Sequence, residues 1–265
     1  MRTRVVTSIV SVLLFFAVFF APAVVFNVAL ALVSVIMLYE LLKAIGADKI
    51  IFFVGFLNAV LASAGIFFSG YLTEVIIAIL CINMLTSVFF FNRGNTKTIY
   101  MASMLSMFAA FFMSAAAKLK LEYGSAAVFV IFLSAWMTDI GGFFGGYFFG
   151  KHKLSPHVSP KKTVEGAVGG ILLCVALNVL YALFLNYICS SWIEFHADYL
   201  TFALLGLGAS IAGQLGDLSA SVIKREYKIK DFGTIFPGHG GVMDRFDSVI
   251  FIAPFAYYFI KYFVA

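Results

Sequence analysis

The segment from Ser221 to Asp247 gathers cations, carboxylates and a glycine-rich turn over a short length of chain. The residues concerned are Lys224, Arg225, Lys230, Asp231, Pro237, Gly238, His239, Gly240, Gly241, Asp244, Arg245 and Asp247. Carboxylate oxygens suit Mg²⁺, while cations and free backbone N–H groups suit phosphate oxygens. We therefore interpret the segment as a site for a metal-bound nucleotide phosphate. A solvated loop would explain the charges, but not the glycines, the histidine and the Asp-Arg-Phe-Asp sequence together.

Two more carboxylates, Asp139 and Asp217, lie inside or at the margin of apolar runs. A charged side chain at the centre of a bilayer costs at least about 2.5 to 3.5 kcal/mol, so such a group should face a water-filled cavity or a partner. Both acids are therefore candidate site residues. The alternative is a structural ion pair or a position near a helix end. It carries more weight for Asp139 than for Asp217, and the site interpretation is favoured for both.

A basic loop from Lys151 to Glu165 separates these two acids in the sequence. Lys151 and Lys153 could simply anchor the chain on anionic lipid. The stretch from Ser159 to Thr163 is more specific: its proline stiffens the turn, and Thr163 or Ser159 could cap the following helix. The N-terminus of that helix would attract phosphate.

Glycines recur every four residues just before this loop, at Gly142, Gly146 and Gly150. On a helix this spacing forms a smooth groove into which another backbone fits, so close helix packing is the favoured interpretation. Such a groove could also admit a ligand. The run lacks the pattern of a phosphate-binding P-loop.

The composition shows what must position these residues. The chain is 63% hydrophobic and only 12% charged, whereas an ordinary soluble domain is about half apolar and a quarter charged. Its apolar runs reach the roughly 20 residues that a helix needs to cross a bilayer, and they do not alternate as barrel strands do. We predict an all-α polytopic membrane protein. The net charge is +5. In a membrane protein, basic residues usually mark the cytoplasmic side, where they meet anionic lipid headgroups, so no nucleic-acid partner is expected. The spacing of the three cysteines indicates neither a disulfide framework nor a zinc site.

About nine spans are predicted from the lengths of the apolar runs. They lie near Val5 to Phe20, Ala23 to Leu42, Ile50 to Phe68, Glu74 to Phe91, Ile99 to Ala117, Ser125 to Phe149, Gly166 to Ile188, Thr201 to Val222 and Ser248 to Val264. The first run resembles a signal peptide, but another run follows at once, so an uncleaved hairpin is favoured.

The distribution of Lys and Arg places the N-terminus and both polar loops, 151–165 and 223–247, in the cytoplasm. We expect residues 1–124 to form a transmembrane scaffold and residues 125–265 to form the catalytic region.

The polar segment resembles the phosphatidate cytidylyltransferases, also called CDP-diacylglycerol synthases. The matching residues are Ser221, Lys224, Arg225, Lys230, Asp231, Pro237, His239, Gly240, Gly241, Asp244, Arg245 and Asp247. The resemblance extends upstream through Gly216-Asp217-Leu218 to Asp139. One departure is Gly142-Phe143, where the family would have Ala-Tyr, which removes a hydroxyl and puts a polar role for position 143 in doubt.

The resemblance implies that a phosphate oxygen of phosphatidic acid attacks the α-phosphorus of CTP, giving CDP-diacylglycerol and pyrophosphate in the cell inner membrane. It implies carboxylates that hold Mg²⁺ or Mn²⁺, namely Asp217, Asp244 and Asp247, with Asp231 a less certain member. A second cation and a homodimer are left open. Lys224, Arg225, Lys230 and Arg245 would neutralise phosphates, and His239 with the Gly240-Gly241 backbone would donate to the triphosphate or the departing pyrophosphate. Asp139 and Lys162 would complete the cavity from the other loop. The remaining substrate-binding residues would be Ser159, Thr163 and Ser221.

Two alternatives remain open at this point. A CTP-dependent lipid kinase, such as a polyprenol or phytol kinase, would transfer the γ-phosphoryl group to a hydroxyl, and the full signature is less typical of it. An ion-coupled transporter would also carry intramembrane acids and glycine-broken helices. Against it, the polar residues collect in two loops on the same side, and the sequence shows no internal repeat.

Overall fold

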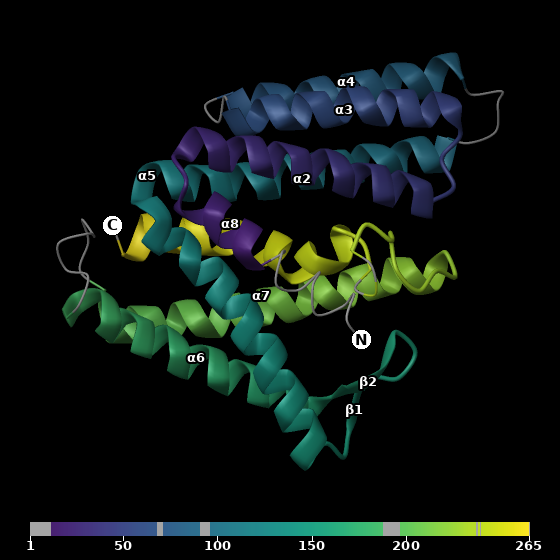
Figure 1. Ribbon diagram of the computed structural model, residues 1–265. Helices are drawn as coiled ribbons and strands as arrows, with labels where there is room; N and C mark the ends of the chain where they lie inside the picture. Colours follow the sequence, from purple (N-terminus) through teal and green to yellow (C-terminus); the bar gives the residue numbers. More distant parts are fainter. Residues whose placement is uncertain are drawn as a thin grey trace. The chain divides into compact units, whose positions relative to one another are not determined.

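The protein is described by a computed structural model over residues 12–67, 71–90, 96–187, 197–236, 238 and 240–264. Apart from one hairpin, its elements are helices (Figure 1). They are α2 (Ala23–Ala44), α3 (Lys49–Phe67), α4 (Leu72–Phe89), α5 (Thr96–Phe149), β1 (Lys153–Ser155), β2 (Ser159–Thr163), α6 (Val164–Tyr187), α7 (Tyr199–Glu226) and α8 (Met243–Phe263). Residues 12–20 are also helical, whereas the start of the first predicted span lies outside the described residues.

Seven helices of the described part are long and apolar enough to cross a membrane. A spanning helix satisfies its backbone hydrogen bonds internally, which hydrocarbon surroundings demand. The predicted class, an all-α polytopic membrane protein, is confirmed. The count of nine spans and the cytoplasmic N-terminus stay predictions.

Two predicted spans, Ile99 to Ala117 and Ser125 to Phe149, belong to the single element α5. At 1.5 Å per residue its 54 residues would extend about 81 Å, far more than the roughly 30 Å of a hydrocarbon core. The helix is interrupted at Gly124, whose φ of 76° and ψ of −170° are non-helical. Glycine adopts this positive φ without the clash that a Cβ would cause, so α5 consists of two arms, each long enough to span.

Helices α2 and α3 show how the sequence ends one span and begins the next. Gly46 follows α2 with φ 68°, and its N–H donates to the carbonyl of Lys43. Asp48 then caps α3, because its Oδ1 accepts the N–H groups of Ile50 and Ile51 at 3.0 and 2.9 Å. A left-handed glycine and an acidic cap are the usual end and start of a helix, and they make this connection short.

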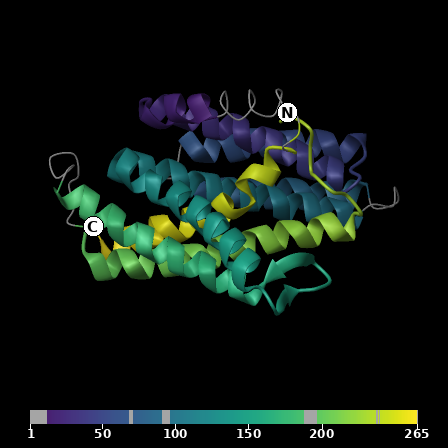
Figure 2. The ribbon, with the colours of Figure 1, turned by 60° about the horizontal axis from the view of Figure 1, so that its bottom comes forward.

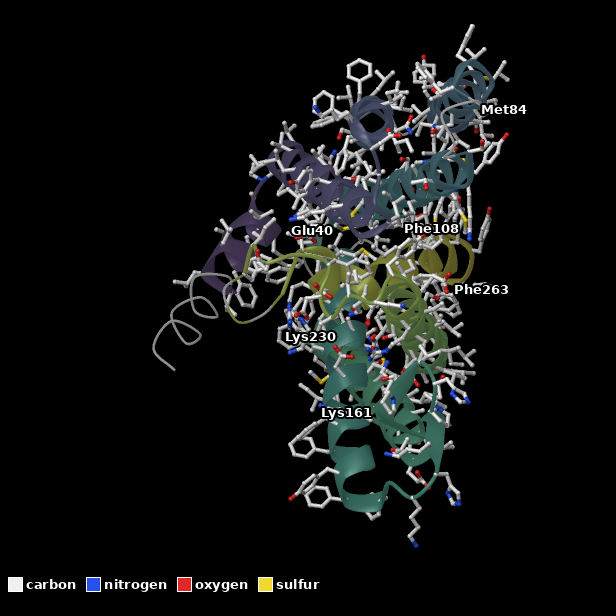
Figure 3. All side chains as sticks on the ribbon, turned by 90° about the vertical axis from the view of Figure 1, so that its right-hand side faces the viewer. Glu40, Met84, Phe108, Lys161, Lys230 and Phe263 are labelled. Atoms are coloured by element: carbon white, nitrogen blue, oxygen red, sulfur yellow. The ribbon has the colours of Figure 1, made fainter. Side chains whose placement is uncertain are left out.

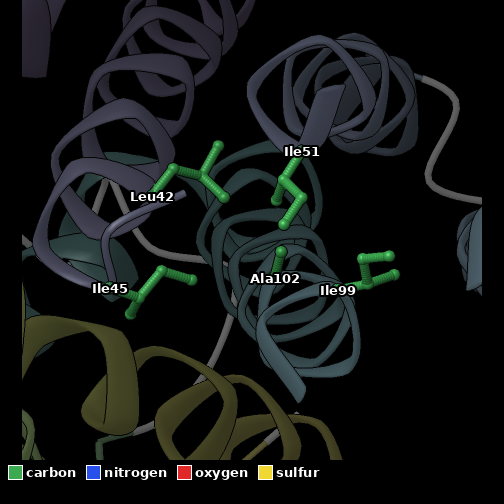
Figure 4. Packing of buried hydrophobic residues seen from close by; sticks show 5 residues of the cluster. All are labelled: Leu42, Ile45, Ile51, Ile99 and Ala102. Atoms are coloured by element: carbon green, nitrogen blue, oxygen red, sulfur yellow. The ribbon is translucent and has the colours of Figure 1, made fainter. Parts of the chain in front are cut away.

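The chain forms two compact units that are not contiguous in sequence. The first contains the described residues up to Lys118 together with residues 227–245, which we call the motif segment. Helix α3 packs between α2 and α4. Leu42, Ile45, Ile51, Ile99 and Ala102 form one of its apolar clusters (Figure 4). The hydroxyl of Tyr227 donates to the sulfur of Met101 and so joins the motif segment to α5.

The second unit contains residues 119–226 and the chain from Phe246 onward. In it α6 and α7 run side by side, and the β1–β2 hairpin directly precedes α6 (Figure 2). Buried polar contacts fix the helices: Thr138 Oγ1 donates to Ser210 Oγ at 2.9 Å, and Asn178 donates to Ser134 Oγ at 3.1 Å. The predicted roles of residues 1–124 and 125–265, scaffold and catalytic region, stay predictions.

Candidate functional site

Glycines let α5 and α6 approach at backbone distance. A Cβ placed on Gly141 would lie 2.5 Å from the carbonyl oxygen of Gly169, and one on Gly166 would lie 2.7 Å from that of Gly142. Both distances are too short for any side chain. The glycine-rich part of α5 therefore packs on α6, as expected from the spacing. The tightest position is Gly141, one residue before the predicted repeat, whereas a Cβ on Gly142 would have its nearest neighbour at 3.7 Å.

A cavity of about 390 Å³ opens beside this helix pair, within the second unit. Four of the predicted site residues line it, namely Asp139, Lys162, Thr163 and Asp217. Its other lining residues are Thr138, Gly142, Phe143, Gly146, Tyr147, Leu154, Lys161, Gly166, Ala167 and Gln214. The cavity thus has charged groups on some walls. Another wall carries the aromatic residues Phe143 and Tyr147, each more than half exposed.

The ammonium of Lys162 and the carboxylate of Asp217 form an ion pair and hydrogen bond across this cavity. Strand β2 carries the lysine and α7 carries the aspartate. Their side chains are 30% and 26% exposed, so the pair is partly desolvated and still open to a ligand. Such a lysine is a candidate ligand for an anion that enters the cavity.

The basic loop predicted between Lys151 and Glu165 contains a two-stranded antiparallel hairpin, in which Lys153 is opposite Thr163 and Ser155 is opposite Ser159. Ser159 therefore lies in the hairpin, whereas Thr163 caps α6 by accepting the N–H of Gly166 at 3.1 Å. Thr163 and Ser159 were the two predicted caps of this helix, and the structure shows that Thr163 is the cap.

Two contacts anchor the hairpin to its surroundings. Glu165 accepts the backbone N–H groups of Lys151 and His152, and one of its oxygens lies 2.6 Å from Nδ1 of His152. At the tip, Arg225 Nε donates to the carbonyl of Val158 at 3.0 Å. This predicted phosphate ligand therefore also ties the end of α7 to the hairpin.

Acidic groups gather where α7 passes α8. The Asp247 carboxylate interacts electrostatically with the carboxylates of Asp217 and Asp139 and with the ammonium of Lys224. A Cβ on Gly216 would lie only 2.4 Å from the backbone oxygen of Asp247, which shows how close the two helices come. Ser221 is buried on the same helix as Asp217. Repulsion among three carboxylates favours binding of a cation.

The motif segment is organised by Asp244. One carboxylate oxygen accepts the N–H groups of Phe232 and Gly241, at 2.8 and 2.9 Å. The N–H of Phe236 donates to the carbonyl of Gly240, whose φ is 86°. Asp244 therefore holds its own loop together, and the N–H of Gly241, a predicted phosphate donor, is directed at Asp244.

Three of the remaining predicted residues of the motif segment lie at its surface. Lys230, Asp231 and Arg245 are exposed. His239 and Pro237 lie outside the described residues. Asp244 and Asp247 both belong to the first turns of α8, three positions apart, a spacing that places side chains on one helix face. The structure thus collects Asp139, Lys162, Thr163, Asp217, Lys224 and Asp247 in the second unit, and Lys230, Asp231, Gly240, Gly241, Asp244 and Arg245 in the first.

A model of the Cytidylyltransferase family matches residues 2–263. The chain belongs to this family. Among its relatives, the phosphatidate cytidylyltransferase of Bacillus subtilis is 42% identical over 142 residues, which are 54% of this chain and 50% of that protein. The phosphatidate cytidylyltransferase of Thermotoga maritima is 34% identical over 165 residues, 62% of this chain and 60% of the other. That of Staphylococcus aureus is 46% identical over 127 residues, 46% and 44% of the two chains. These matches span about half the length of the curated relatives.

The acidic groups of this cytidylyltransferase-family chain fit a hard divalent cation. No cluster of three His, Cys, Asp or Glu residues that could hold a metal by itself occurs within the described ranges. Mg²⁺, however, is commonly held by one or two carboxylates together with substrate phosphates. Asp217 and Asp247, which interact electrostatically, supply such a partial donor set. The third predicted ligand, Asp244, has one oxygen already bonded to two N–H groups.

Gln214 and Thr138 are among the cavity residues that were not singled out in the sequence. Gln214 donates to the carbonyl of Ala167 at 3.1 Å, and Thr138 bonds Ser210. Gln214 precedes Asp217 by three positions and so lies on the same face of α7. A polar residue at this spacing from an intramembrane acid was the signal that could have identified it.

Proposed function

We propose that this chain transfers the cytidylyl group of CTP to phosphatidic acid, forming CDP-diacylglycerol and releasing pyrophosphate. The observation that carries the proposal is the cavity beside α5 and α6. It combines the Lys162–Asp217 pair with the exposed rings of Phe143 and Tyr147. A phosphate with acyl chains needs both kinds of wall. Family membership and the activity for which the relatives are named point to the same reaction.

The nucleophile needs little activation. A phosphomonoester has its second pKa at about 6, so the lipid phosphate is already largely dianionic at neutral pH. One of its oxygens forms a bond to the α-phosphorus of CTP while the bond between the α-phosphorus and the bridging oxygen breaks, and that oxygen leaves with pyrophosphate. The main barrier is repulsion between two polyanions, which positioned cations reduce.

The chain's own cations meet this need. Lys162 at the cavity wall is placed to bind a phosphate oxygen, while Lys224 lies within electrostatic range of the acidic cluster. Arg225, anchored on the hairpin, would add a planar donor, and guanidinium groups match phosphate geometry. Lys230 and Arg245, exposed on the motif segment, would neutralise the triphosphate, and His239 is proposed as a further donor.

A divalent cation, Mg²⁺ or Mn²⁺, completes the proposal. In the second unit Asp217 and Asp247 would hold it, and such a cation supplies neutralisation of phosphate charge. Asp244, in the first unit, stays a metal ligand predicted from the sequence. Asp247→Asn removes one charge at constant size, so it should raise the Mg²⁺ concentration needed for half-maximal rate. An unchanged Mg²⁺ dependence with near-normal turnover would remove Asp247 from the metal site.

The protein is a multi-pass membrane protein, and we place its active site on the cytoplasmic side of the cell inner membrane, where CTP is available. The basic bias of both polar loops supports this orientation. A homodimer stays a prediction, which a mass measurement of the detergent-solubilised protein tests.

The direct test is to incubate purified protein with CTP, phosphatidic acid and Mg²⁺ and to measure both products. Stoichiometric CDP-diacylglycerol and pyrophosphate are expected. CDP together with a phosphorylated lipid alcohol, on addition of polyprenol or phytol, would instead indicate a CTP-dependent kinase. Ion flux in liposomes without any turnover would indicate a transporter.

A further inference from the structure

An acidic residue of the first half of the chain is buried against the motif segment. Glu40, in the last turns of α2, is only 2% exposed. Its Oε1 accepts the N–H of Val242 at 3.1 Å, and its Oε2 accepts the N–H of Met243 at 2.9 Å. Figure 3 shows Glu40 on α2 next to the yellow-green chain that leads into α8.

These two N–H groups are ones that a helix cannot satisfy by itself. Helix α8 begins at Met243, and the first four N–H groups of a helix have no intrahelical acceptor. A carboxylate is favoured there by the helix dipole and by charge-assisted hydrogen bonds. An N-cap normally comes from the residue just before the helix. Here a side chain about 200 positions earlier in the sequence provides an equivalent contact.

Two glycines of the motif segment are shaped to this carboxylate. A Cβ on Gly233 would lie 2.0 Å from Oε1 of Glu40, and one on Gly241 would lie 2.5 Å from the same atom. Any larger residue at either position would displace the carboxylate. The N–H of Gly241 in turn donates to Asp244. Glu40 therefore holds the segment from one side, and Asp244 holds it from within.

We propose that Glu40 is a positioning residue: through Val242 and Met243 it fixes the start of α8 and so the placement of Asp244 and Arg245, the residues of the motif segment predicted to bind Mg²⁺–CTP. The proposal rests on the cytidylyltransferase activity proposed above. It assigns a role in nucleotide binding to an acid of the half of the chain expected to be scaffold.

The first test is Glu40→Gln, which keeps the shape and removes the charge. The amide oxygen can still accept one N–H, but the amide nitrogen then faces the other N–H, donor against donor. The start of α8 should shift, and small displacements of groups near the reaction cost up to about 100-fold in rate. We expect kcat to fall about 10- to 100-fold and the KM for Mg²⁺–CTP to rise at least about fivefold, with the KM for phosphatidic acid changed less than about twofold.

This pattern separates positioning from loss of folded protein. A smaller active fraction lowers the apparent kcat and leaves both KM values unchanged. The matched control is Glu74→Gln, the same substitution at an exposed acid in the first turn of α4, which should leave all three constants unchanged. Amide hydrogen exchange should accelerate in Glu40→Gln at residues 240–245 and stay unchanged in α3 and α4.

A second test keeps the Glu40 carboxylate but displaces it from the N–H groups of Val242 and Met243. Gly233→Ala introduces a methyl group. The close contacts of this methyl group are all with side-chain atoms of Glu40 beyond Cβ. Glu40→Ala deletes these atoms. We expect Gly233→Ala alone to raise the KM for Mg²⁺–CTP, and to add less than about twofold in the Glu40→Ala background. This cycle still decides the question if Glu40→Gln folds poorly.

The outcomes separate this proposal from the proposed function. If the wild type forms CDP-diacylglycerol and Glu40→Gln equals it in kcat and both KM values, the positioning role is wrong while the activity stands. The role is also wrong if Gly233→Ala has the same effect with and without Glu40. If the wild type gives no product, the proposed function fails and takes the positioning role with it.

Discussion

The ion pair between Lys162 and Asp217 gives the sharpest test of what the cavity does. Lys162→Met removes the ammonium and keeps most of the apolar stem, Asp217→Asn removes the carboxylate charge, and the double variant removes both. If the pair only stabilises the fold, replacing both partners should restore what either single change loses. If the two charges act on substrate, the double variant should fold well and remain inactive.

The size of the structural effect follows from exposure. Exposed pairs contribute about 0.2 to 1 kcal/mol, whereas breaking a fully buried pair costs about 3 to 5 kcal/mol. With side chains 30% and 26% exposed, this pair lies between these limits, so each single variant should lose about 1 to 2 kcal/mol. For a chain of this size that is a fall in Tm of roughly 2 to 8 °C. The double variant should recover most of it.

The expected loss of activity is larger. Removing one group that stabilises developing charge typically lowers kcat about 100- to 1,000-fold. We expect such a loss for Lys162→Met and for Asp217→Asn, and no recovery in the double variant. Initial rates of CDP-diacylglycerol formation and thermal melting in the same detergent measure the two effects separately. Lys161→Met, which removes the neighbouring ammonium from the same strand, is the matched control and should be much milder. Recovery of turnover together with stability in the double variant would refute a substrate role for the pair.

Three further predictions concern packing, topology and lipid access. Gly141→Ala should destabilise the protein by about 1 to 3 kcal/mol, since its methyl would meet a carbonyl oxygen at 2.5 Å, whereas Gly142→Ala, with its nearest neighbour at 3.7 Å, should melt like the wild type. Single cysteines at Lys153 and Lys228 of a cysteine-free protein should react with an impermeant thiol reagent only after cells are opened, and labelling of intact cells would reverse the orientation. Water-soluble short-chain phosphatidic acid should have a lower kcat/KM than long-chain lipid, because each CH₂ withdrawn from burial forfeits about 0.8 kcal/mol, and equal values measured below micelle formation would argue against entry from the bilayer.

The helices were largely predictable because the length and polarity of an apolar run decide whether it spans. The predicted Ala23 to Leu42 and the observed α2 begin at the same residue. Helix α7 was predicted to stop at Val222 but continues to Glu226. By composition, a cation such as Lys224 indicates a loop. In the last turn of a helix, however, a cation is stabilised by the helix dipole, so Lys224 still belongs to α7. The β1–β2 hairpin was not predicted, since its short strands follow no hydropathy pattern.

The site was predictable in its chemistry and less so in its pairings. Local sequence identified Asp217 as an acid in an apolar run, but its partner Lys162 lies 55 positions away. Glu40 gave the same signal, an acid beside a run of apolar residues, and it was not singled out because nothing near it in sequence suggested a ligand. Its partners are 202 and 203 positions distant, and only the packed chain brings them together.

That separation also sets an order of events during synthesis. At about 5 to 20 residues per second, the 202 positions between Glu40 and Val242 correspond to roughly 10 to 40 s of translation. During this time the carboxylate sits in the last turns of an inserted span without the N–H groups that will bind it. An unpartnered acid is costly in such a place, so the early helices must leave it in contact with water. The emerging start of α8 then replaces that water, and the nascent first unit closes only when the motif segment has been made.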